Sequence, residues 1–192
     1  MFSRRKLLTA SAALLGLCLP RSSFAQSMPV PTGAQAELLA KLAGFDRNFA
    51  ARAGGKAVIL LVTMPGQAES AKAALEMKAA LSRLPTVGNL PHEELMLNFS
   101  NAAALAEQVR AKRAAIVYFG PGFDKQAAAI RDALTSLDVL SVGALPEYVP
   151  NGIVLGFDLV SGRPKLLIHV VQARKQNVAF PGSVLSLMKV HP

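Results

Sequence analysis

Cysteine is almost absent from this sequence, with Cys18 as its only occurrence. Because Cys18 lies within the first 25 residues, the chain that follows can form no disulfide and offers no thiol nucleophile or thiolate metal ligand. Aromatic residues are also scarce, at 6% of the chain. A surface that binds a partner must therefore be built mainly from aliphatic side chains.

The usual signatures of metal sites, serine hydrolases and nucleotide-binding sites are missing as well. His92, His169 and His191 lie far apart, and none has a second imidazole or a carboxylate three or four residues away. No Gly-x-Ser-x-Gly elbow is present. We therefore predict no cofactor, no metal ligand and no catalytic residue, and these absences favour a binding protein over an enzyme.

Two polar features inside apolar or mixed segments have simple explanations. His169 lies in an apolar run and is interpreted as a satisfied core or edge histidine. Glu93 and Glu94 are adjacent, so in a strand they would point to opposite faces and could not act together on one substrate. We interpret them as solvated loop charges.

Basic residues exceed acidic ones, and the formal net charge is +9. Part of this excess comes from Arg4, Arg5, Lys6 and Arg21, near the start of the chain. The remaining basic residues are scattered and have no aromatic side chains between them, so the sequence predicts no binding to nucleic acid.

The beginning of the chain is typical of a signal peptide. Arg4, Arg5 and Lys6 precede a short apolar stretch at residues 7–19, which is too short to span a membrane, and Ala25 follows Ser23 as a small residue at a cleavage position. The adjacent arginines resemble the twin-arginine export signal, although ordinary secretory leaders also carry paired basic residues. We predict a signal peptide at residues 1–25, export to the periplasm, and a single domain at residues 26–192.

The middle of the chain alternates between strand and helix patterns. Continuous apolar runs at residues 57–63 and 114–119 are typical of strands buried on both faces, and shorter strands are expected at residues 95–99 and 139–142. Helical spacing of apolar residues predicts helices between these strands and a single helix of about 17 residues before Gly54. This alternation predicts an α/β fold, a three-layer sandwich around a mainly parallel sheet.

The last fifty or so residues follow a different pattern. Two β-rich runs, at residues 153–159 and 165–171, flank Ser161 and Gly162, which predicts a hairpin. A short helix and then a final helix from about Ser183 are expected after it. The predicted fold therefore ends in a C-terminal β-hairpin plus helix.

Gly120 and Gly122 follow a buried strand, at the sheet edge where ligands bind in folds of this class. Lys125 stands where the dinucleotide fingerprint needs a third glycine, so that fingerprint fails. We predict a ligand loop formed by Gly120, Gly122 and Lys125, in which Lys125 could meet an anion. The alternative is a tight turn that uses the glycines only to join strand and helix.

The C-terminal part of the chain carries four characteristic runs, at residues 139–142, 151–155, 165–173 and 183–188. In their order and spacing, these runs resemble the YfiR-like family of periplasmic domains. His169 stands where the family pattern has asparagine, and Pro181 interrupts a stretch that is usually regular. Family members with cysteine pairs use disulfides, which this chain cannot share.

The resemblance implies a regulatory domain, often dimeric, that binds the periplasmic part of a membrane signalling protein. It resembles a repressor of a membrane diguanylate cyclase, and related domains are fused to sensor kinases. We expect Val184, Leu187 and Met188 on the final helix to contact the partner, with packing of these residues onto the sheet as the alternative. The other functions that remain open are a small-ligand sensor or carrier and an enzyme with dispersed catalytic residues.

Overall fold

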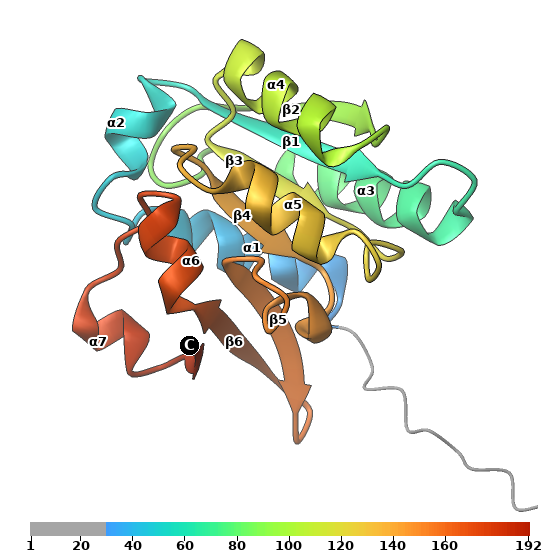
Figure 1. Cartoon of the computed structure of the whole chain (residues 1–192). Coiled ribbons are helices and arrows are strands. Elements are labelled where there is room, and N and C mark those ends of the chain that lie inside the picture. Colours follow the sequence, from blue (N-terminus) through green and yellow to red (C-terminus); the bar gives the residue numbers. More distant parts are fainter. Residues whose placement is uncertain (1–29) are drawn as a thin grey trace, which may run out of the picture.

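The computed structural model describes residues 30–192, so the predicted signal peptide lies outside the described residues (Figure 1). Seven strands form one sheet in the order β2-β1-β3-β4-β5-β6-β7, and all neighbouring pairs except β5 and β6 are parallel. The strands are β1 (Ala57–Thr63), β2 (His92–Asn98), β3 (Ile116–Phe119), β4 (Leu140–Gly143), β5 (Leu155–Val160), β6 (Arg163–His169) and β7 (Lys189–His191). The helices are α1 (Thr32–Ala43), α2 (Phe49–Ala53), α3 (Ala68–Leu81), α4 (Ala102–Lys112), α5 (Ala127–Leu134), the single 3-10 turn η1 (Pro146–Tyr148), α6 (Val170–Lys175) and α7 (Gly182–Leu185).

The central strands are covered by helices on both faces, which confirms the predicted three-layer arrangement (Figure 1). Side chains of a strand alternate between faces, so Ile59 and Leu61 of β1 join the core beneath α1 and α3. Leu60 and Val62 join the core beneath α4 and α5. Since both faces are covered, the strand can be apolar at successive positions, as β1 is from Ala57 to Val62.

The single helix predicted before Gly54 is wrong, because the chain forms two helices, α1 and α2, separated by residues 44–48. The break is fixed by Asp46, whose carboxylate accepts hydrogen bonds from the backbone N–H groups of Asn48 (3.2 Å) and Ala179 (2.9 Å). An acidic side chain that bonds nearby backbone in this way competes with helix formation. Phe45, an apolar residue within this break, is exposed as a result.

Arg52 of α2 joins this break to distant parts of the chain. Its guanidinium donates to Asp46 (2.7 Å), to Asp138 (2.6 Å) and to the carbonyl of Asn177 (2.8 Å). The Arg52 side chain is 2% exposed and that of Asp46 is 0% exposed. A buried ion pair therefore ties α2 to the segment between α6 and α7.

The crossover from β4 to β5 has no full-length helix and uses η1 instead. Gly143 and Gly156 are register partners in β4 and β5. A Cβ on Gly143 would lie 2.8 Å from the Tyr148 ring, and one on Gly156 would lie 2.5 Å from Val149. The two glycines thus make the space in which η1 lies close against the sheet.

The predicted hairpin is present as β5 and β6, joined by Ser161 and Gly162, both of which have positive φ. Two such residues in a two-residue loop suit the twist of a hairpin. The helix predicted from Ser183 is short, and the chain then adds β7, a strand parallel to β6 that the sequence did not predict. The C-terminus thus ends at an edge of the sheet.

The opposite edge of the sheet, β2, carries charged residues. Glu93 and Glu94 lie in this strand, so their interpretation as loop charges is wrong. Lys56 donates to Glu93 (2.6 Å), and this hydrogen bond together with the lysine's charge lowers the Glu93 pKa. Glu94 contacts His92 (2.5 Å) on the other side of the strand. Charges of this kind discourage pairing of an edge strand with other chains.

Candidate functional site

The order in which successive strands join the sheet changes direction between β1 and β3. The connection through α3 leads from β1 to β2 on one side, whereas the connection through α4 leads from β2 back to β3 on the other. Ligands of open α/β sheets bind outside the carboxyl ends of the strands at such a point. A ligand site is therefore expected at the carboxyl ends of the strands, which we call the carboxyl edge of the sheet.

A pocket of about 300 Å³ lies there, and we refer to it as the carboxyl-edge pocket. It is bounded by α1, by α3 and by the segments that leave β3 and β4. Its polar lining residues are Thr32, Gln35, Glu69, Lys72, Glu76 and Tyr118.

The floor of this pocket is a set of buried polar groups that satisfy one another. The Tyr118 hydroxyl donates to Gln35 Oε1 (2.9 Å), and Gln35 Nε2 donates to the carbonyls of Val30 (2.8 Å) and Ala144 (3.3 Å). Burial raises the pKa of Tyr118, with Tyr148 and then Glu76 adding to the effect, so its phenol stays neutral. The role of Gln35 was not predicted from the sequence. The sequence signal for it is a polar residue on the buried face of a helix.

The rim of the pocket is charged and open to solvent. Glu69, Lys72 and Glu76 are exposed on α3, and Thr32 Oγ1 donates to Glu76 Oε2 (3.1 Å). Mixed charges over a hydrogen-bonded floor can hold a small polar molecule, but they supply no activated nucleophile.

The predicted ligand loop lies next to this pocket. The Gly120 carbonyl accepts a hydrogen bond from the Tyr148 hydroxyl (3.2 Å), and Gly122 has a φ of +96°, in a turn where a Cβ would meet the Gln67 side chain at 2.5 Å. The positive φ and the close approach of Gln67 explain the glycine at position 122, and a Cβ at position 120 would lie 3.2 Å from the Ser70 carbonyl oxygen. Lys125 is exposed before α5, and its contact with an anion stays a prediction.

An enzyme with dispersed catalytic residues would need polar side chains to converge on one pocket, and those that follow β2 and β3 do not. Asn98 lines a small pocket of about 120 Å³ and accepts from Thr63 Oγ1 (2.7 Å), while the Asn101 side chain caps α4. Asp124 and Lys125 are exposed in the turn before α5. Within residues 30–192, no group of three or more His, Cys, Asp or Glu side chains is placed to hold a metal ion.

The three residues expected to contact a partner differ in exposure. Val184 and Met188 are buried in the core, which is the packing alternative, whereas Leu187 is 67% exposed. Val190 of β7, which sequence reasoning missed, is 50% exposed. We call Leu187 and Val190 the C-terminal apolar edge, and contact of Leu187 with a partner stays a prediction.

The whole described domain agrees with one sequence family. The profile of the YfiR/HmsC-like family matches residues 34–189. The chain belongs to the YfiR/HmsC-like family. This confirms the resemblance noted at the C-terminal end and extends it back into α1. No helix within residues 30–192 is long and apolar enough to cross a membrane.

Solved structures share the fold of this YfiR/HmsC-like chain. An ABC domain from Streptococcus pneumoniae in complex with L-Trp has a TM-score of 0.58 at 13% identity, covering 84% of this chain and 62% of its own. A conserved domain protein from Vibrio cholerae has a TM-score of 0.54 at 16% identity, covering 83% and 60%. CD0873 from Clostridium difficile, a substrate-binding protein with adhesive properties, has a TM-score of 0.55 at 8% identity, covering 75% and 57%.

At these identities the likeness concerns the fold. The YfiR/HmsC-like chain spans about three fifths of the length of the structures it matches. None of the curated proteins compared with it matches. The neighbours show that the α/β architecture is shared with binding proteins.

His169 is one departure from the YfiR/HmsC-like pattern, which has asparagine at this position. His169 precedes α6, and its Nδ1 accepts from the backbone N–H of Gln172 (3.3 Å), so it is the N-cap of that helix. Asparagine is a strong N-cap as well. Histidine therefore fills a position at which asparagine would also cap the helix.

This cap makes part of the protein's stability depend on pH. Burial lowers the pKa of His169, a backbone hydrogen bond partly opposes this shift, and Coulombic repulsion from His191, Arg131 and Lys175 adds to it. The unfolded chain takes up a proton near pH 6.5 more readily than the folded one, so this contribution is present above pH 6.5 and is lost as the pH falls below it.

We expect His169→Asn to unfold with a weaker dependence on pH than the wild type in mild acid, because asparagine caps the helix without titrating. Thermal unfolding measured from neutral pH downwards checks this. If the two proteins lose stability in parallel, His169 is not the group responsible.

Proposed function

We propose that this chain is a periplasmic, non-enzymatic regulatory protein that restrains a membrane signalling protein. The observation that carries the proposal is membership of the YfiR/HmsC-like family over residues 34–189. The partner we propose is the periplasmic part of a membrane diguanylate cyclase, or of a related kinase. Release of the regulator would then raise cyclic di-GMP.

The C-terminal apolar edge is the surface we propose for this partner. Leu187 and Val190 are the exposed aliphatic side chains at the end of the sheet, and β7 has no neighbouring strand on its outer side within the described residues. An open strand edge can add a strand from another protein, with neighbouring apolar side chains giving specificity. A second copy of the chain could use the same edge, which is how a homodimer would form.

The test is cellular cyclic di-GMP in a strain that lacks this protein. We expect the level to rise on deletion and to return to the parental level when the exported protein is re-expressed. An unchanged level on deletion would contradict the cyclase-repressor role.

A matched pair of variants tests the proposed surface in the same strain. Leu187→Asp places a charge on the C-terminal apolar edge and should fail to restore the low level. Leu75→Asp places the same charge on α3, where Leu75 is 59% exposed, and should restore it. Both proteins must reach wild-type abundance in the periplasm, and full restoration by Leu187→Asp would move the partner surface elsewhere.

A second candidate function is a sensor or carrier of a small ligand. The carboxyl-edge pocket favours it, because it lies at the position where open α/β sheets bind ligands and has a polar floor. The same deletion experiment separates the two functions, since a carrier would leave cyclic di-GMP unchanged.

A further inference from the structure

Positive charge is concentrated at the C-terminal end of the described domain. Residues 153–192 hold five basic residues and one acidic residue, whereas residues 30–152 hold twelve basic and eleven acidic residues. None of the five has an ion-pair partner among residues 30–192; they are Arg163, Lys165, Arg174, Lys175 and Lys189. The hairpin, α6 and β7 therefore form a basic end on a domain that is otherwise close to neutral.

Three of these cations lie on one face of the sheet, beside its C-terminal edge. Arg163 and Lys165 are two residues apart in β6, so their side chains leave the strand on the same face. Lys189 is the register partner of Leu167, the next residue of β6 on that face. Lys165 Nζ donates to the Leu187 carbonyl (2.9 Å), which places this ammonium group beside the segment that leads into β7. We call Arg163, Lys165 and Lys189 the basic face.

One acidic residue shares this face but forms no ion pair with its cations. Asp158 of β5 is the register partner of Lys165, and its Oδ1 accepts a hydrogen bond from the backbone N–H of Leu159 (2.8 Å). Arg163 and Lys189 are exposed, and Lys165 is half-buried. The face therefore keeps an excess of positive charge that is open to solvent.

Exposed aliphatic side chains lie next to the basic face. Val160, the register partner of Arg163 across the hairpin, is 51% exposed. Leu187, whose carbonyl binds Lys165, is 67% exposed. In Figure 1 the loop of the β5–β6 hairpin points away from the helices that cover the centre of the sheet. This end of the domain thus presents apolar side chains among unpaired cations.

A layer of anionic lipid headgroups is complementary to this arrangement. Basic residues near a membrane surface are attracted to anionic lipids, and apolar side chains beside them enter the boundary between headgroups and acyl chains. Lipids move laterally, so they can meet cations on separate strands. An acidic protein would have to supply carboxylates at fixed matching positions, and it is the alternative occupant.

We propose that the basic face and Val160 bind the surface of an anionic phospholipid bilayer, with the loop of the β5–β6 hairpin directed toward the lipid. The contact is peripheral and combines the charges of Arg163, Lys165 and Lys189 with shallow burial of aliphatic side chains. It does not depend on the proposed function, because it requires no protein partner.

The test is co-sedimentation of the purified exported protein with lipid vesicles at low ionic strength. One set of vesicles is phosphatidylcholine alone, and in the other set about a third of the lipid is phosphatidylglycerol. We expect the protein to bind the anionic vesicles about tenfold or more tightly than the neutral ones, because each lysine or arginine near such a surface adds to the attraction. Equal binding to both sets would overturn the proposal. Binding to poly-L-glutamate but not to anionic vesicles would assign the basic face to an acidic polypeptide, which overturns it as well.

Two double variants locate the contact. Arg163→Gln with Lys189→Gln should weaken binding to the anionic vesicles about tenfold or more. Lys78→Gln with Arg83→Gln removes two exposed charges near the end of α3 and should bind like the wild type. Equal loss in both variants would mean general charge attraction and would overturn the assignment to this face.

A tryptophan reporter gives an independent readout of position, because the chain contains no tryptophan of its own. With anionic vesicles, the emission of Val160→Trp should shift to shorter wavelength as the indole enters the lipid. The control is Leu75→Trp on α3, where Leu75 is 59% exposed, and its emission should not move. A shift in Leu75→Trp without one in Val160→Trp would place the lipid contact elsewhere and overturn the proposal.

Discussion

Arg52→Ala is expected to lower the free energy of unfolding by about 3–5 kcal/mol, because it leaves a buried charge without its partner. The carboxylate of Asp46 is fully buried and has Arg52 as its ion-pair partner. Two backbone N–H groups would remain bonded to Asp46, but they carry no net charge. Arg52→Lys should fall between alanine and the wild type, since lysine keeps the charge but cannot reach three acceptors in different directions.

Urea denaturation near neutral pH measures this loss as a shift of the midpoint. The matched control is Lys56→Ala, which breaks the ion pair with Glu93 at the surface, where both side chains are about half exposed. Exposed pairs contribute little to stability, so its midpoint should stay close to the wild type. Equal effects of Arg52→Ala and Lys56→Ala would show that the Arg52 network does not hold the C-terminal segment.

Gly143→Val is expected to lower the free energy of unfolding by about 3 kcal/mol, at the upper end of the usual cost of overpacking. A Cβ at this position already lies 2.8 Å from the Tyr148 ring, and valine adds two methyl groups in a buried site. Because the Tyr148 hydroxyl accepts from the Phe123 N–H (3.0 Å) and donates to Gly120, displacement of the ring should also loosen the loop after β3.

Two measurements separate these effects. Urea denaturation gives the stability, and the Phe123 amide chemical shift reports the loop. Gly33→Ala in the first turn of α1 is the control, since no atom lies within 4 Å of the position of its Cβ, and it should unfold like the wild type. A wild-type midpoint and an unchanged Phe123 shift in Gly143→Val would mean that η1 moves aside without cost.

The periodic parts of the fold could be predicted because their signals are local. The apolar run at residues 57–63 is β1, and α4 (Ala102–Lys112) lies between two of the predicted strands, as expected. Both elements are determined by the side chains along one stretch of chain and by burial on one or both faces. The same holds for the hairpin, where the turn residues lie between the two strands.

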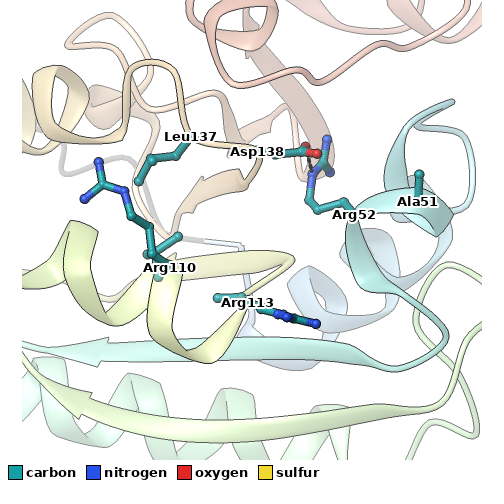
Figure 2. A pocket seen from close by; sticks show the side chains of 8 residues that line it. Ala51, Arg52, Arg110, Arg113, Leu137 and Asp138 are labelled. Carbon is teal, nitrogen blue, oxygen red and sulfur yellow. Dashed lines mark hydrogen bonds and ion pairs between the residues drawn. The ribbon is translucent and has the colours of Figure 1, made fainter.

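The features that could not be predicted depend on residues far apart in the sequence. The break between α1 and α2 requires Asp46 to bond with Ala179, and the floor of the carboxyl-edge pocket requires Gln35 to meet Tyr118. β7 has only three residues, too few for a periodic pattern, and exists because β6 pairs with it. A pocket near the amino ends of β3 and β4 likewise combines residues of α2, of α4 and of the segment before β4 (Figure 2).

The sheet has few paired residues between β4 and β5. Only Val142 with Leu155 and Gly143 with Gly156 are in register there, and the neighbouring N–H groups of Ser141 and Val154 bond to side chains instead. Strands β1 to β4 and strands β5 to β7 are thus two ladders joined by a narrow seam. Leu187 and Val190 lie on the far side of this seam from strands β1 to β4.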